Sequence, residues 1–147
     1  MCYVHKNFLF THAGLTKTWC RRNEIDYTQS FENLEAELNE LFYYRRHAFY
    51  FSPGHKMDAY GDEPTQGPLW VRPNSLLLDK IDGIHIVGHT QQEEIRRYQD
   101  IVIIDAMGVG EYLAIIDDEL FVNRVLTGGE ITSRKLEKKN VLYNFLG

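Results

Sequence analysis

The chain has 147 residues, of which 44% are hydrophobic and 25% are charged, and its formal net charge is −5. This length and composition are typical of one globular domain with a substantial core. The basic residues occur as scattered pairs rather than as one cluster, which argues against nucleic acid as a partner.

The N-terminal residues contain no charged segment that leads into a long apolar run, and no apolar stretch has the length of a membrane span. Cys2 and Cys20 are the only cysteines, and their spacing indicates neither a zinc site nor a disulfide framework. We therefore expect a cytoplasmic protein with two ordinary thiols and no membrane partner.

Residues Asn7–His12 predict a buried strand close to the start of the sequence. An inner strand needs a neighbour on each side, and few residues precede this one. We therefore expect the chain to be the C-terminal part of a larger domain. In that case an apolar edge near Phe8–Phe10 would be exposed and would cause dimerisation or poor solubility.

The clearest helix runs from Ser30 to about Phe49, because apolar residues recur there at intervals of three and four. Residues Ser52–Pro73 contain repeated prolines and glycines and predict a long loop, of a length that is often functional. A short helix is expected at Asn74–Lys80, with Asn74 as its cap.

The second half of the chain predicts mainly strands. A hairpin turn is expected at residues 117–119, and Lys135–Asn140 is expected to be a charged surface or tail segment. The strands are predicted at Ile84–Val87, Ile101–Ile104, Tyr112–Ile116 and Leu120–Val125.

Two histidines close apolar runs in short frames, Thr11-His12-Ala13-Gly14 and Gly88-His89-Thr90. A strand that ends at a histidine holds the imidazole at the rim of a sheet, and neutral imidazole binds zinc, iron and manganese. Either histidine alone is weak evidence, since a histidine after a strand is more often capped or partly buried. Of the other histidines, His55 falls in the long loop and His85 reads as a satisfied sheet residue.

Four segments together resemble the calcineurin-like metallophosphoesterases, in particular the phosphoprotein phosphatase branch. That branch includes serine/threonine phosphatases and diadenosine tetraphosphatases. The segments occur in the order of the family's motifs. They are residues 8–15, 67–73, 86–90 and 103–116, the second of which reads Gly67-Pro68-Leu69-Trp70-Val71-Arg72-Pro73.

The resemblance implies an α/β (α+β) fold in which two packed sheets are flanked by helices. Residues 1–147 would form a single domain that is the C-terminal portion of such a fold. It would supply most of one sheet, a helical insertion at about 20–50 and a substrate-side loop at about 52–73.

The resemblance also implies metal-dependent hydrolysis of a phosphate ester, with manganese, iron or zinc as the divalent metal. His12 and His89 would bind the same ion, and Arg72 would bind the phosphoryl oxygens as a planar two-pronged donor. The expected partner is a phosphorylated small molecule or a phosphopeptide. No catalytic residue is assigned.

Three family elements are not found in the chain: Asp-x-His, Gly-Asp-x-x-Asp-Arg-Gly and Gly-Asn-His-Glu/Asp. Gly61-Asp62-Glu63 does not replace the second of them, because it lacks the continuation and follows His12. Two imidazoles without an anionic ligand should hold a divalent ion poorly, since catalytic zinc usually has three protein ligands.

Three hypotheses therefore remain open. The chain is part of a phosphoesterase site, or it is a non-catalytic relative that binds a phosphate ligand or a protein partner. In the third hypothesis the gene continues upstream, and Met1 is an internal or wrongly assigned start. The expected protein partner is a second copy of the chain, in a homo-oligomer, or a missing N-terminal half.

Overall fold

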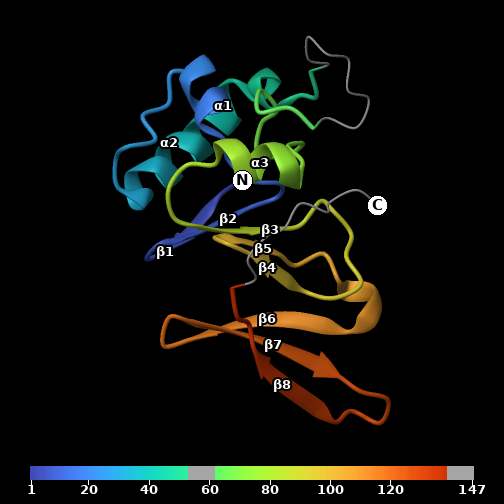
Figure 1. Cartoon of the computed structure of the whole chain (residues 1–147). Helices are drawn as coiled ribbons and strands as arrows, with labels where there is room; N and C mark the ends of the chain where they lie inside the picture. The colour runs from blue at the N-terminus through green and yellow to red at the C-terminus, as the bar shows by residue number, and fades with distance from the viewer. Residues whose placement is uncertain (53–61, 139–147) are drawn as a thin grey trace.

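The computed structural model describes residues 1–52 and 62–138. Its elements form three layers, with helices on one side of a five-stranded sheet and a three-stranded sheet on the other (Figure 1). The chain is thus a mixed α/β protein, as the sequence predicts. Its strands form two sheets, however, where most of one was expected.

The five-stranded sheet has three parallel inner strands and an antiparallel strand at each edge. In spatial order the strands are β1 (Tyr3–His5), β2 (Phe8–Thr11), β3 (Ile84–Val87), β5 (Ile101–Ile103) and β4 (Arg96–Tyr98). Because β2, β3 and β5 run in the same direction, their C-terminal ends meet at one edge of the sheet, which we call the carboxyl edge.

Side chains of the inner strands alternate between the two neighbouring layers, as the two-residue period of a strand requires. Phe8 and Ile86 pack in one cluster with Leu120 and Val122 of the three-stranded sheet. Leu9 belongs instead to the cluster beneath the helices. Burial on both faces explains why these strands read as nearly continuous apolar runs.

The three-stranded sheet is an antiparallel meander in the order β6, β7, β8. The strands are β6 (Glu111–Ile116), β7 (Glu119–Val125) and β8 (Ile131–Lys135). Asp117 and Asp118 both have positive φ, 50° and 65°, as in the two-residue hairpin turns that favour aspartate and asparagine. The predicted turn is confirmed, although Glu119 already belongs to β7.

Helix α2 (Phe31–Tyr44) is the longest helix of the layer that covers the five-stranded sheet, and it buries Leu34 and Leu38. The Oγ of Ser30 accepts a hydrogen bond from the backbone N–H of Asn33 at 3.4 Å, so the predicted start is confirmed. The α-helix ends earlier than expected, because Arg45 leaves the helical conformation. The helical elements are α1 (Lys17–Arg22), α2 (Phe31–Tyr44), α3 (Pro73–Asp79) and the 3-10 turns η1 (Arg46–Phe49) and η2 (Met107–Val109).

The expectation of an exposed apolar edge near Phe8–Phe10 is wrong. Strand β1 pairs with β2 through a turn at Lys6 and Asn7, so β2 has a neighbour on each side. Phe8 and Leu9 are buried as a result. A hairpin needs only two turn residues, so the seven residues before Phe8 are enough to form both a partner strand and the turn.

Helix α3 begins at Pro73, and Arg72 rather than Asn74 is the residue before it. Proline suits the first position of a helix, because no partner is needed there for its nitrogen. The Asp62 carboxylate accepts hydrogen bonds from the backbone N–H of Ser75 and from Nδ2 of Asn74, both at 2.9 Å. Asp62 therefore caps the helix, a role that the sequence assigned to Asn74.

The sequence also missed α1, β4 and β8, which are all short. The part of the predicted loop at 53–61, with His55, lies outside the described residues, as do the last two residues of Lys135–Asn140. In the described part of the chain, no helix is both long and apolar enough to cross a lipid bilayer.

Candidate functional site

His12 and His89 lie side by side at the carboxyl edge of the five-stranded sheet. Thr11 of β2 is paired with Val87 of β3, and the two histidines follow these residues closely. The backbone N–H of Gly88 donates to the carbonyl oxygen of His12 at 2.9 Å, which extends the pairing beyond the strands. The parallel register of β2 and β3 therefore brings the two predicted ligands together.

The two imidazole rings face each other through specific nitrogens. Nε2 of His12 lies 3.0 Å from Nδ1 of His89, and the ring centroids are 4.8 Å apart at an interplanar angle of 63°. Such a distance fits a hydrogen bond between two neutral rings, whose direction depends on the tautomers. It equally fits two nitrogens that share one ion.

The backbone at His89 is in the left-handed region, with φ +62°. A residue with a Cβ is uncommon there, and such conformations cluster at functional sites because the surrounding structure has to hold them. The pairing of Gly88 with His12 and the contact of Arg72 with the His89 carbonyl hold this turn.

Gly14 makes the turn after His12 possible. Its φ is +122°, and a Cβ there would lie 2.4 Å from Cδ2 of Leu76 in α3. No side chain fits between the turn and the helix, so the glycine allows the His12 turn to lie directly against α3.

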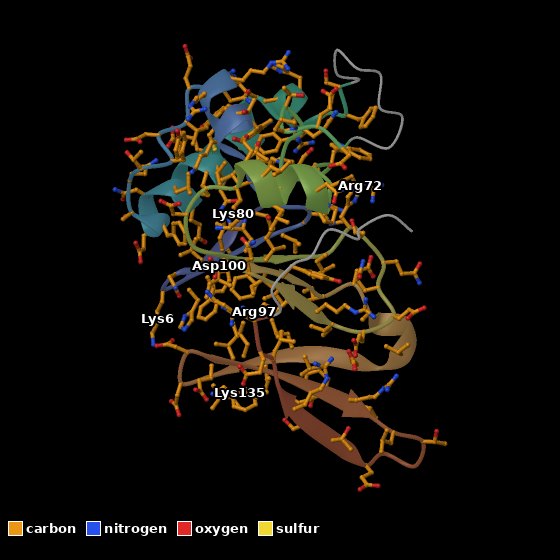
Figure 2. All side chains as sticks on the ribbon, viewed as in Figure 1. Lys6, Arg72, Lys80, Arg97, Asp100 and Lys135 are labelled. Carbon is orange, nitrogen blue, oxygen red and sulfur yellow. The ribbon has the colours of Figure 1, made fainter. Side chains whose placement is uncertain are left out.

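Arg72 is the third predicted site residue, and it joins the histidine pair. Its Nη1 donates to the carbonyl oxygen of His89 at 3.2 Å and lies 3.4 Å from Oγ1 of Thr90. Figure 2 shows Arg72 at the start of α3, at the opposite end of that helix from Lys80. The guanidinium is therefore tied to the same loop that carries the imidazole of His89.

Backbone contacts fix the segment that carries Arg72. The N–H of Ala13 donates to the carbonyl oxygen of Pro68 at 2.7 Å, which links the His12 turn to this segment. Asp62 caps α3 just after Arg72. His12, Arg72 and His89 thus come from three separate parts of the sequence and are connected by short hydrogen bonds.

Two aromatic side chains continue the site outward from His89. The Trp70 ring meets His89 edge-on, with centroids 5.7 Å apart and planes at 88°. Phe51 meets Trp70 at 5.5 Å and 72°. The motif had indicated Trp70, but nothing in the sequence indicated Phe51, because it comes from the connection after η1.

The surroundings favour a neutral imidazole at His89. Partial burial lowers its pKa most, and the Arg72 guanidinium and His12 lower the pKa further, while Asp105 acts in the opposite direction. Neutral imidazole is the form that binds a metal ion. The sequence analysis did not assign Asp105 to the site. A signal was present, because Asp105 follows β5, and β5 is a third parallel strand that ends at the carboxyl edge.

The histidine pair fits the first part of a metal site. Two nitrogens about 2.1 Å from one ion lie about 3.0 Å apart at the right angle of octahedral coordination, and about 3.4 Å apart at the tetrahedral angle typical of zinc. The observed separation of 3.0 Å matches the octahedral value. Within residues 1–52 and 62–138, however, no group of three histidine, cysteine or acidic side chains is arranged to hold an ion. Any further ligands would have to come from outside the described residues.

Nε2 of His89 is buried, and no described residue accepts or donates a hydrogen bond there. If Nδ1 of His89 bound an ion, the proton of the neutral ring would be on this Nε2. Metal-binding histidines usually donate that proton to an acceptor. The pair therefore has the ligand separation of a metal site but lacks one supporting contact.

His85 is a buried histidine of the sheet, as the sequence predicted, but only one of its ring nitrogens is satisfied, because Nδ1 has no hydrogen-bond partner among the described residues. Its ring is fully buried in β3, and Nε2 lies 3.1 Å from the carbonyl oxygen of Ile81. His47, by contrast, is exposed in η1. Neither is a neighbour of the pair at the carboxyl edge.

Comparison of the chain with protein-family models, with curated proteins and with solved structures gives no match in any of the three.

Proposed function

We propose that this chain contributes to the metal-dependent hydrolysis of a phosphate ester, with His12 and His89 as two ligands of one manganese, iron or zinc ion. The observation that supports this most directly is the 3.0 Å separation of Nε2 of His12 and Nδ1 of His89, beside the Arg72 guanidinium. The resemblance of four segments to calcineurin-like metallophosphoesterases points to the same chemistry.

In this proposal each residue has a separate task. The two imidazoles present neutral nitrogens to the ion, and the parallel strands fix their separation. Arg72 binds phosphoryl oxygens, because a guanidinium offers several donors in one plane. A divalent ion bound there would act as a Lewis acid toward the phosphoryl group.

The arrangement of layers is compatible with the fold that the resemblance implies. Two sheets pack against each other, and helices cover the outer face of one of them. In the proposal this chain is the C-terminal portion of a metallophosphoesterase fold, and the ligands that complete the ion's coordination come from outside the described residues.

A second candidate is a non-catalytic module that binds a phosphate group or a protein partner without turnover. The observation that favours it is the lack of a third ligand side chain among the residues that the structure describes. Arg72 and the histidine pair would still bind a phosphate in such a protein.

Metal binding and hydrolysis together test the first candidate. Manganese affinity should be measured by calorimetry, and turnover with a generic phosphate ester, for the natural chain and for His12→Ala, His89→Ala and Arg72→Lys. Loss of a supporting contact costs about 10–100-fold in metal affinity, so loss of a direct ligand should cost at least as much. Arg72→Lys should weaken phosphate binding and spare the metal.

His47→Ala is the matched control, since His47 is an exposed histidine in η1 rather than at the carboxyl edge. The metal proposal fails if manganese binds equally well to the natural chain and to His89→Ala. Phosphate binding that depends on Arg72, without bound metal and without turnover, would select the non-catalytic module.

A further inference from the structure

The two tryptophans of the chain are anchored alike but covered very differently. Nε1 of Trp19 donates to the carbonyl oxygen of Ala48 at 3.2 Å, and Nε1 of Trp70 donates to that of Phe49 at 3.1 Å. Trp19 is 2% exposed, whereas Trp70 is 38% exposed. The Trp70 ring is therefore held in one orientation while a large part of it stays open to solvent.

The open ring lies next to the residues proposed to bind the ion and the phosphate. Trp70 is in ring contact with the imidazole of His89 and with Phe51. Phe51 is 39% exposed. Phe51 and Trp70 together form what we call the aromatic wall, which is in contact with His89 through Trp70.

Fixed, half-open aromatic rings beside polar groups are a common way to bind a planar apolar ligand. The polar part here is Arg72, which donates to the carbonyl of His89, the same residue that Trp70 touches. A phosphate bound by Arg72 and the histidine pair would therefore have the aromatic wall one ring away. A small alkyl ester would leave that wall in water, whereas a ring bonded to the ester oxygen would cover it.

We propose that the ligand of this site is an aryl phosphate, in which an aromatic ring is bonded directly to the phosphate ester oxygen and rests on Trp70. A phosphorylated tyrosine side chain has this chemistry. The inference rests on the proposed function only for the phosphate-binding role of Arg72 and the histidine pair. A nucleotide also joins a ring to a phosphate, but a sugar separates the two, so its base would reach past Trp70.

Binding affinities test the proposal without requiring turnover. Phenyl phosphate and methyl phosphate should be titrated into the natural chain in the presence of manganese, with the indole N–H resonance of Trp70 followed by NMR. An aromatic contact of this kind is worth about tenfold in affinity, so phenyl phosphate should bind about tenfold more tightly and should shift that resonance.

Variants then locate the effect. Trp70→Leu should bring the affinity ratio of the two esters close to one, and Trp70→Phe, which keeps a ring, should retain most of it. Tyr43→Leu is the control, because Tyr43 is 73% exposed and belongs to α2 rather than to the aromatic wall. Far-UV circular dichroism confirms that each variant is folded.

The outcomes separate this inference from the proposed function. Equal affinities for the two esters, both weakened by Arg72→Lys, would overturn the aryl preference and leave the phosphate site standing. No binding of either ester would overturn both. Adenosine 5′-monophosphate binding more tightly than phenyl phosphate through Trp70 would refute the aryl ester and indicate a nucleotide instead.

Discussion

His85 makes the stability of this chain depend on pH in a way that the structure allows to be worked out. The imidazole is fully buried in β3, with Nε2 near the carbonyl of Ile81 and no hydrogen-bond partner for Nδ1 among the described residues. The pKa of His85 is lowered to about 4, mainly by burial and in smaller part by Lys80, while the Ile81 carbonyl and Asp100 oppose the shift.

The sign follows from the proton balance. The unfolded chain has an ordinary histidine pKa of 6.5, so below that pH it binds a proton that the folded chain excludes. The contribution of His85 to the free energy of unfolding is therefore present above pH 6.5 and is lost as the pH falls toward 4. With these two pKa values the loss between pH 7 and pH 5 is about 2 kcal/mol.

Urea denaturation at pH 7 and at pH 5, for the natural chain and for His85→Gln, measures this directly. Glutamine does not titrate. Between pH 7 and pH 5 the free energy of unfolding should therefore fall by about 2 kcal/mol more in the natural chain than in the variant. His89 also has a lowered pKa, but it is present in both proteins and cancels. The same pH dependence in both proteins would refute the reasoning, and His47→Gln should behave like the natural chain.

Two further predictions concern the turns that support the site. Gly14→Ala should lower the free energy of unfolding by about 1–3 kcal/mol, because the new Cβ would meet Leu76 at 2.4 Å in a left-handed backbone. Gly108→Ala is the control and should change the free energy of unfolding little, because nothing lies within 4 Å of the added Cβ. Equal effects of the two substitutions in chemical denaturation would contradict this prediction. Asp62→Ala should remove the cap of α3 and cost about 1 kcal/mol in thermal or chemical unfolding, whereas Asp82→Ala, at a fully exposed carboxylate, should cost clearly less.

The inner strands were predictable because a strand buried on both faces leaves a strong apolar signal. Phe8–Thr11 and Ile84–Val87 were expected nearly as observed. Three of the edge strands, β1, β4 and β8, carry polar residues, as edge strands commonly do, so their local pattern resembles that of loops. Their existence depends on pairing with neighbours, which a local reading does not reveal.

The residues of the candidate site likewise fall into those with a local sequence motif and those placed only by packing. His12, His89 and Arg72 were proposed from short motifs, and the structure brings all three together. Asp62 falls in the expected substrate-side loop but was assigned no role, and Phe51 was assigned no place near the site. Asp62 reaches α3 from the connection that precedes it, and Phe51 meets Trp70 beside η1, where Phe49 accepts the hydrogen bond of Trp70. Contacts of this kind are decided by packing between separate segments, and they have no signature within either segment.

The left-handed backbone at His89 implies a trade-off between folding stability and the proposed metal-binding role at that position. Glycine adopts such a conformation without steric cost, so replacing this histidine with glycine should relieve backbone strain in the folded state. A chain selected in the laboratory for heat resistance alone would be expected to drift toward glycine there, and to lose its imidazole pair in the process.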